Sequence, residues 1–130
     1  HKKGDKLAQK QIHPTAIEYG GQGLPLTEMN ARGRAGSVKA YKKCPGWSVV
    51  YTPGGRVPFK GMIFKNPALA RTYRMIARGG RETFYKGAVA KQIARFVKEH
   101  GGFLTVADLA DHHSEWAAPV SSTDRVHTVR

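Results

Sequence analysis

The densest group of chemically reactive side chains lies near the C-terminal end of the sequence. It comprises two aspartates, two histidines and a glutamate: Asp108, Asp111, His112, His113 and Glu115. Asp108 and His112 are four residues apart, a spacing that places two side chains on one face of a helix, where they could share a metal ion. Two ligands do not complete a site, and no third ligand follows at a recognisable spacing. We therefore favour a solvated helix end, where histidine also suits the helix dipole, and predict no metal.

Cys44 is the only cysteine and follows Lys42 and Lys43, whose positive charge could activate a thiol as a nucleophile. The surrounding sequence offers no acid or base partner for it. We therefore favour an unreactive free thiol, which cannot form a disulfide within the chain.

Two glycine-rich stretches have the composition of phosphate-binding loops. The first, Gly-Gly-Gln-Gly at 20–23, follows a helical pattern and runs into Leu-Pro-Leu, whereas phosphate-binding loops lie between a strand and a helix. The second, from Gly54 to Gly61, lacks the Gly-Lys-Ser/Thr ending that places a lysine and a hydroxyl group on nucleotide phosphate and magnesium. We favour a helix end for the first and a surface loop for the second, and predict no cofactor.

The positive charge is the most unusual property of the composition. Twenty-two Lys and Arg against nine Asp and Glu give a formal net charge of +13 and a pI near 10.2 in 130 residues. Such a field attracts polyanions such as nucleic acid or an acidic protein surface. Arg71, Arg74 and Arg78 also share one face of an expected helix. A basic binding surface is therefore one hypothesis for function.

Aromatic residues are interleaved with these basic residues and could stack on bases. The residues concerned are Tyr41, Trp47, Tyr51, Phe59, Tyr73, Phe84 and Tyr85. The alternative is that the aromatic residues belong to the core, which helical spacing favours for Tyr73, Phe84 and Phe96. Both uses stay open for the others.

Capping and turn residues predict about five helices and two short strands. Thr27 is a good N-cap for a helix from Glu28 to Lys43. Asn66-Pro67 is the clearest helix start, and Gly79-Gly80 is expected to end that helix. The other expected elements are a helix end at 14–19, a β-prone run at 47–51, a helical turn at 83–85, a helix at 88–100, a capping box at 105–108 that opens a helix to about 111, and a strand-like tail at 119–130.

The predicted fold class is mainly α with short strands. Each expected helix has a narrow apolar stripe and the loops are long, so these residues alone are not expected to bury a sufficient core or to form a complete domain. We divide the chain into a basic flexible arm at 1–13 and a second part at 14–130. The longest apolar runs, such as Trp47 to Tyr51, are far shorter than the ~20 residues that cross a bilayer, so we predict no membrane span.

Several motifs occur in a distinctive order. They include AIEYGGQGLPLT at 16–27, PGW at 45–47, PGGRVPFKG at 53–61 and most of 64–123. The strongest pieces are Asn66-Pro67-Ala68-Leu69-Ala70-x-Thr72, Phe84-Tyr85-x-Gly87 with Ala90, Gly101-Gly102-x-Leu104-Thr105, and Asp108-Leu109 leading to Trp116 and Pro119. From about Thr15 onward, this order and spacing resembles the large-subunit region of the gamma-glutamyltransferase (gamma-glutamyltranspeptidase) family.

This resemblance implies that 14–130 is a helical segment of the large subunit of an N-terminal-nucleophile hydrolase with αββα architecture. In that family a precursor cleaves itself, and the freed N-terminal threonine of the small subunit attacks the γ-glutamyl amide of glutathione or a similar donor. The acyl group then passes to water or to an amino acid. The threonine is activated by its own α-amine, and backbone donors stabilise the oxyanion. The implied partners are the remainder of the large subunit and the small catalytic subunit.

The motifs that carry catalysis in the family do not occur in these residues. The nucleophilic threonine lies downstream of the matched segment and the donor-binding arginine lies upstream. Thr123-Asp124-Arg125-Val126 stands where the family usually has a Tyr-Arg-Gly strand. We therefore assign no catalytic, cofactor-binding or metal-binding residue and expect no catalysis by this chain alone. The alternative is a non-catalytic remnant of the fold that acts as a basic structural or RNA-binding subunit of a larger assembly.

Overall fold

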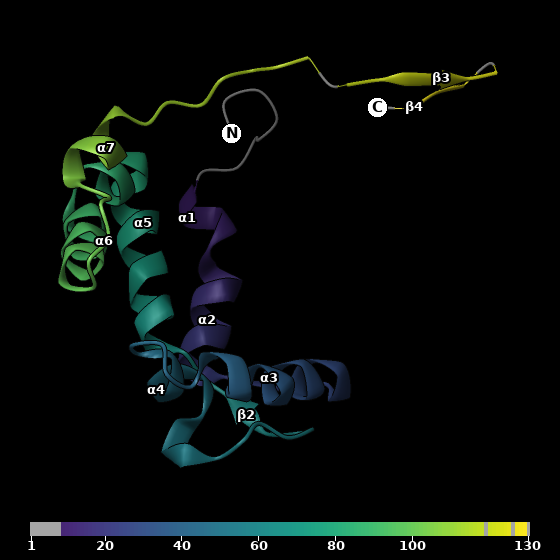
Figure 1. Cartoon of the computed structure of the whole chain (residues 1–130), viewed down its shortest axis with the longest axis vertical. Helices are drawn as coiled ribbons and strands as arrows, with labels where there is room; N and C mark the ends of the chain where they lie inside the picture. The colour runs from purple at the N-terminus through teal and green to yellow at the C-terminus, as the bar shows by residue number, and fades with distance from the viewer. Residues whose placement is uncertain (1–8, 119, 126, 130) are drawn as a thin grey trace.

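The computed structural model describes residues 9–118, 120–125 and 127–129, and this part of the chain is mainly helical (Figure 1). The elements in chain order are α1 (Gln9–Ile12), α2 (Pro14–Gln22), β1 (Leu24–Pro25), α3 (Glu28–Tyr41), α4 (Trp47–Tyr51), the 3₁₀ turn η1 (Pro53–Gly55), β2 (Ile63–Phe64), α5 (Pro67–Tyr85), α6 (Ala88–Glu99), α7 (Val106–Asp111), β3 (Ser122–Asp124) and β4 (His127–Val129). The predicted fold class, mainly α with short strands, is confirmed. The helical turn α1 lies within the arm predicted at 1–13, whose residues 1–8 lie outside the described part, so the arm stays a prediction.

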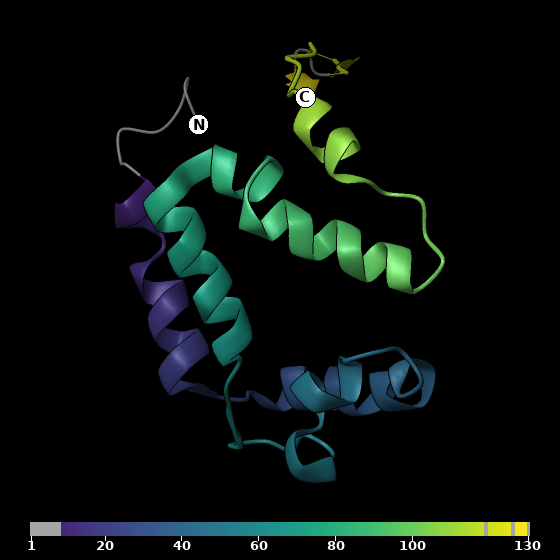
Figure 2. The same ribbon diagram turned by 90° about the vertical axis from the view of Figure 1, so that its left-hand side faces the viewer.

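The helices α2 and α5 lie side by side and form the central helix pair (Figure 2). α5 begins as predicted: the Asn66 side chain accepts a hydrogen bond from the Leu69 backbone N–H at 3.0 Å, and Pro67 follows at the first helical position. The helices approach closely because Gly20 faces Ala70. A Cβ atom on Gly20 would lie 3.0 Å from the Ala70 Cβ, and Ala70 itself has an exposed fraction of 0%. Small residues therefore set the spacing of this pair.

α5 consists of two helical stretches that meet at a kink at Gly80. Gly80 has φ 60° and ψ −151°, a backbone conformation that is essentially restricted to glycine. The helical turn expected at 83–85 is the part of α5 beyond this bend. The prediction that Gly79-Gly80 closes the first helix is therefore confirmed, and a second, short helical stretch follows the kink within α5.

The largest buried cluster lies where α3 meets the antiparallel pair of β1 and β2. Leu24 pairs with Phe64 in this two-stranded sheet, and the Leu26 N–H donates to the Met62 carbonyl at 2.9 Å just beyond it. The buried members of the cluster are Leu26, Ala31 and Phe64, against which Val50, Tyr51 and Met62 pack. This cluster holds α3 and α4 across one end of the α2–α5 pair (Figure 2).

The residues Trp47–Tyr51 form the helix α4, so the prediction of a β-prone run is wrong at this point. In the helix, Trp47 and Tyr51 lie four residues apart on one face, with ring centroids 5.3 Å apart. Tyr51 stacks on the buried ring of Phe64 at 6.0 Å. The Thr52 hydroxyl also donates to the Ser48 carbonyl at 2.8 Å. Packing of the two rings overrides the strand preference of aromatic and β-branched residues.

α6 and α7 agree closely with the sequence prediction. Gly101, with φ 77°, ends the α6 region, and the Gly102 N–H donates to the Val97 carbonyl at 2.8 Å. A Cβ atom on Gly102 would lie only 2.5 Å from the Val97 Cγ1, so a glycine is required where the chain leaves the helix. The chain then turns back, and α7 begins at the predicted Thr105–Asp108 capping box.

The strands β3 and β4 form an antiparallel hairpin that stands away from the helices (Figure 1). The strand-like tail is therefore confirmed at Ser122–Asp124 and His127–Val129. Pro119, Val126 and Arg130, which also belong to the predicted tail, lie outside the described residues.

The described residues bury few apolar side chains. Those that are buried are Leu26, Ala31, Phe64, Ala70, Val89, Ala90 and Ala94. Phe96, which helical spacing assigned to the core, is 48% exposed, and its ring lies against that of His100 on the same helix, so that prediction is wrong. Tyr73 and Phe84 are half-buried. Within the described ranges, no helix is both long enough and apolar enough to cross a membrane.

Candidate functional site

Asp108 is engaged in capping α7. Its Oδ2 atom accepts hydrogen bonds from the backbone N–H and from the hydroxyl of Thr105, both at 2.7 Å. The Asp108 N–H lies 3.2 Å from Thr105 Oγ1 and donates to it in return. Two hydrogen bonds from Thr105 hold the pKa of Asp108 below its ordinary value. The bond from the Thr105 side chain has the larger effect, and the bond from its backbone has the smaller one. The carboxylate considered as a metal ligand therefore has a structural role.

His112 follows α7 and leaves the helical conformation, so it does not share a helix face with Asp108. Its ring stacks on Tyr85, with centroids 4.9 Å apart and planes inclined by 10°. The Arg81 side chain donates to the His112 carbonyl and also lies over the Tyr85 ring, 4.7 Å from its centroid. These contacts join the far end of α5 to the end of α7.

The remaining members of this group do not complete a metal site. His113 Nε2 lies 3.1 Å from Glu115 Oε1, and both side chains are exposed. Over the described ranges, no three His, Cys, Asp or Glu side chains gather in a geometry that could hold a metal ion. An exposed pair of this kind contributes little to stability.

Cys44 is exposed in the turn that follows α3. Its backbone N–H donates to the Tyr41 carbonyl at 2.8 Å, and the Trp47 N–H donates to the Cys44 carbonyl at 3.1 Å. The position of Cys44 is thus set by a backbone turn, and its thiol lies on the surface.

The Gly-Gly-Gln-Gly stretch ends α2, as the sequence predicts. The Gly23 N–H donates to the Tyr19 carbonyl at 2.9 Å, and Gly23 adopts φ 95°. The second glycine-rich stretch forms η1 and the following loop, where the Gly61 N–H donates to the Leu26 carbonyl at 2.9 Å. Both stretches therefore serve chain reversal and strand pairing.

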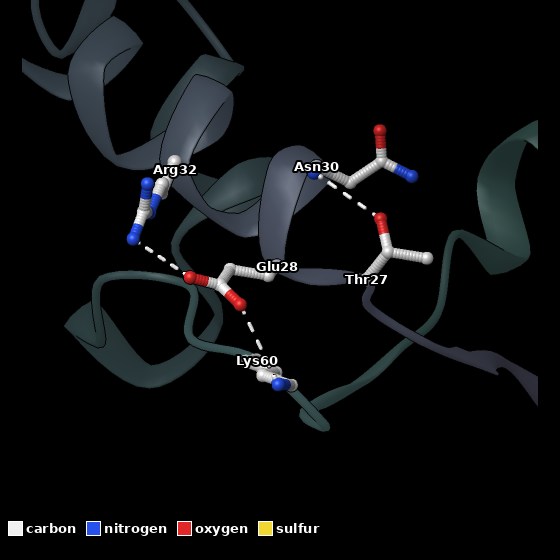
Figure 3. Close-up of polar contacts among 5 residues, drawn as sticks. All are labelled: Thr27, Glu28, Asn30, Arg32 and Lys60. Carbon is white, nitrogen blue, oxygen red and sulfur yellow. Dashed lines mark hydrogen bonds and ion pairs between the residues drawn. The ribbon is translucent and has the colours of Figure 1, made fainter.

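A charged cluster lies at the beginning of α3 (Figure 3). Thr27 accepts a hydrogen bond from the Asn30 backbone N–H at 3.3 Å, which confirms the predicted N-cap. Glu28 binds Arg32 at 2.7 Å and Lys60 at 3.5 Å. Sequence reasoning missed this cluster, although Glu28 and Arg32 have the i, i+4 spacing of helical ion pairs.

A pocket of about 430 Å³ adjoins this cluster. It is lined by Glu28, Ala31, Arg32, Ala35, Pro58, Phe59 and Lys60. The lining holds no hydroxyl, thiol or imidazole group, and its one carboxylate, that of Glu28, is engaged in ion pairs with Arg32 and Lys60. The three charged side chains are more than half exposed, and Glu28 pairs with both cations, so the lining keeps a net charge of +1.

Arg34 is a second feature of α3 that sequence reasoning missed. The guanidinium carbon lies 3.7 Å from the centroid of the Phe64 ring and 5.6 Å from that of Tyr51. The cation therefore packs on the aromatic cluster that joins α3, α4 and β2. Its Nη1 atom is buried without a hydrogen-bond partner among the described residues.

The arginine series of α5 remains available for a polyanion. Arg71, Arg74 and Arg78 are exposed, and none forms an ion pair with a carboxylate of the described residues. The fourth residue of the series, Arg81, differs because it contacts Glu82, Tyr85 and His112.

Comparison with known proteins adds a functional context. A family model described as gamma-glutamyltranspeptidase matches residues 1–130. The chain is 30% identical over 124 residues to a glutathione hydrolase-like YwrD proenzyme of Bacillus subtilis, covering 95% of the chain and 24% of that protein. It is 37% identical over 103 residues to glutathione hydrolase proenzyme 1 of Schizosaccharomyces pombe, covering 78% of the chain and 16% of that protein.

Solved structures show the same relationship. The gamma-glutamyltranspeptidase of Helicobacter pylori matches 98% of the chain with a TM-score of 0.92 and 26% sequence identity, over 37% of its own length. The cephalosporin acylase of Bacillus halodurans matches 95% of the chain with a TM-score of 0.88 and 32% identity, over 24% of its own length. The chain thus spans about a quarter or less of the curated relatives that it matches.

Proposed function

Because the chain belongs to the gamma-glutamyltranspeptidase family, we propose that it provides a helical scaffold in the large subunit of a γ-glutamyltransferase or glutathione hydrolase. The observation that carries the proposal is the match to the Helicobacter pylori gamma-glutamyltranspeptidase, with a TM-score of 0.92 over 98% of the chain. The order of the motifs, from the end of α2 to the capping box of α7, supports the same assignment.

In this proposal the catalytic residues are not among the 130 residues of this sequence. A threonine hydroxyl oxygen, at the N-terminus of the small subunit, attacks the γ-glutamyl carbonyl and forms an acyl-enzyme ester, while the donor amine leaves with a proton. Water or an amino acid then attacks the ester, releases glutamate or a γ-glutamyl product, and returns the proton to the threonine. The residues of this chain contribute the packed helices, and none of them is assigned to bond making or breaking.

The scaffold role is supported by how the chemically capable residues are used. Asp108 caps α7, and His112 stacks on Tyr85. Gly20 allows α2 to lie against α5. Each of these groups thus serves helix capping or helix packing.

The proposal is tested with a γ-glutamyl anilide as donor. The purified 130-residue chain should release no aniline, whereas the native polypeptide isolated from its source should be active and accompanied by a smaller subunit that begins with threonine. The matched control is Helicobacter pylori gamma-glutamyltranspeptidase under the same conditions. Release of aniline by the 130-residue chain alone, or a native polypeptide with no threonine-initiated subunit, would overturn the proposal.

A second candidate function is a basic structural or RNA-binding subunit, which the net charge of +13 and the exposed Arg71, Arg74 and Arg78 favour. Binding of a single-stranded RNA should then weaken steeply with salt, because phosphate contacts release counterions. Replacement of the three arginines by glutamine removes three phosphate contacts. The slope of the logarithm of the binding constant against the logarithm of the salt concentration should therefore become less steep by about 2–3. Binding that does not respond to salt, or is absent, contradicts this candidate.

A further inference from the structure

A groove of about 440 Å³ lies between α6 and the segment that follows it. Its lining is formed by Lys91, Ala94, Arg95, Lys98, Gly102, Phe103, Leu104, Thr105 and Val106. Figure 2 shows this segment leaving the end of α6, turning and running back toward α7. The close contact of Gly102 with Val97, and the Thr105 cap, fix the two ends of the segment and so build the second wall of the groove.

One edge of the groove is basic. Lys91, Arg95 and Lys98 are spaced i, i+4 and i+7, so they lie along one face of α6. Arg95 pairs with Glu99 at 3.8 Å. Within the described ranges, neither Lys91 nor Lys98 forms an ion pair. Two ammonium groups on this edge are therefore available to carboxylates.

The interior of the groove is apolar. Ala94 is buried at its base, and Leu104 and Val106 contribute aliphatic surface. Phe103 is 95% exposed, which leaves almost its whole ring in water at the rim. Removal of this apolar ring from water would favour a complex, so Phe103 is suited to anchor a partner.

The charge and chemistry of the groove restrict its occupant. A second copy of this chain would bring another +13 net charge to a basic edge, which disfavours self-association. A nucleic acid backbone would satisfy the lysines but would leave the alanine, leucine and valine walls against polar phosphate and sugar. A polypeptide with apolar side chains flanked by carboxylates matches both the walls and the edge.

We propose that the groove between α6 and residues 102–106 docks a partner polypeptide segment that inserts an apolar side chain beside Phe103 and Ala94 and places carboxylates against Lys91 and Lys98. This inference concerns binding alone and does not depend on γ-glutamyl transfer. Its test is therefore independent of the test of the proposed function.

The test uses a fluorescein-labelled helical peptide with leucines at i, i+3, i+4 and i+7 and glutamates on both sides of this stripe. One matched probe replaces its glutamates with lysines, and another replaces its leucines with serines. Binding to the 130-residue chain is measured by fluorescence anisotropy at near-physiological salt. The acidic, leucine-bearing peptide should bind, and each matched probe should bind at least about tenfold more weakly.

Variants of the chain locate the binding. Lys91→Glu with Lys98→Glu should weaken binding about tenfold or more, since two attractions become repulsions. Lys42→Glu with Lys43→Glu, at exposed positions beyond α3, makes the same change in net charge and should have less than about a threefold effect. Phe103→Ser should weaken binding roughly fivefold or more through loss of apolar contact. Circular dichroism of each variant verifies that the helices are retained.

Several outcomes would overturn the proposal. They are no binding of the acidic peptide, equal binding of either matched probe, and equal loss of binding in the two double variants. A further such outcome is binding of an oligouridylate probe that requires Lys91 and Lys98 and is not weakened by Phe103→Ser. That result would show a general polyanion site in place of a peptide groove.

Discussion

Gly23 is a residue whose identity follows directly from its surroundings. It has φ 95°, and an added Cβ would lie 2.6 Å from Ile63 Cγ2 and 3.0 Å from the Phe64 carbonyl oxygen. We therefore expect Gly23→Ala to lower the free energy of unfolding by about 2 kcal/mol or more, because backbone strain and overlap with β2 act together. Urea denaturation followed by circular dichroism measures this change.

Gly61 offers the matched control for that substitution. It also has a positive φ, 81°, but no atom lies within 4 Å of the position of an added Cβ. Gly61→Ala should therefore lower the free energy of unfolding by only about 1 kcal/mol, through backbone strain alone. Equal losses for the two variants would show that the contact with β2 has no part in the requirement for glycine at position 23.

Asp108 supplies a pH-dependent contribution to stability. Its pKa is lowered in the folded chain by the hydrogen bonds from Thr105, so folding favours the ionised carboxylate. The contribution is complete above the ordinary value of 3.8 and is lost as the pH falls through the lower folded value. The thermal midpoint of the native chain should therefore fall in this acidic range by more than that of Asp108→Asn. Parallel curves for the two proteins would contradict the capping role of the carboxylate.

The caps show what could be predicted at the residue scale. Thr27, Asn66 and Thr105 each accept a hydrogen bond from a backbone N–H three residues later, so the signal is contained in a short stretch of sequence. The ion pair of Glu28 with Lys60 spans 32 residues. It depends on how the loop after η1 returns to α3, which no local pattern encodes.

At the scale of elements, the bend at Gly80 decides where the second half of α5 points. The part beyond the bend carries Arg81 and Tyr85, which contact His112 after α7. We expect Gly80→Ala to lower the free energy of unfolding by about 1–3 kcal/mol, because its φ and ψ are accessible essentially only to glycine. Thermal unfolding by circular dichroism, together with protection of the α7 amides in hydrogen exchange, measures the loss.

Gly79→Ala is the control for the bend. An added Cβ at this position would overlap the Thr83 hydroxyl, which can rotate to another staggered position. It would also lie 3.1 Å from the Thr83 Cβ, a tight contact that a small shift of this exposed turn relieves. Gly79→Ala should lower the free energy of unfolding by less than about 1 kcal/mol, since alanine also favours the helix. A cost as large as that of Gly80→Ala would show that local crowding, and not the bend, sets the requirement for glycine.

The error of prediction at 47–51 has a physical cause. Trp47–Tyr51 fits both a strand and a helix in its spacing, and stacking of Tyr51 on Phe64 selects the helix. A distant contact thus decides between two local conformations of comparable energy, so the sequence pattern alone leaves the choice open.

At the scale of the whole molecule, the family relationship was predictable, whereas the groove beside α6 was not. The motifs that carry the relationship lie at helix ends and tight contacts, such as Asn66-Pro67 and Gly101-Gly102, where few residue types fit. The groove needs the return of residues 102–106 along α6. Its lysines look like ordinary surface residues in the sequence, and only the fold places them beside Phe103.

The net charge of +13 also acts on the molecule as a whole. Few apolar side chains are buried, so repulsion among the cations is a substantial fraction of a small stability. Because salt screens exposed charges, the thermal midpoint should rise as sodium chloride increases from about 0.01 M to about 0.5 M. Arg71, Arg74 and Arg78 are exposed and have no ion-pair partner among the described residues, so replacing them with glutamine should raise the midpoint at low salt and reduce its rise with salt. A midpoint that falls with salt in both proteins would mean that the described ion pairs, such as Glu28 with Arg32, outweigh the repulsion.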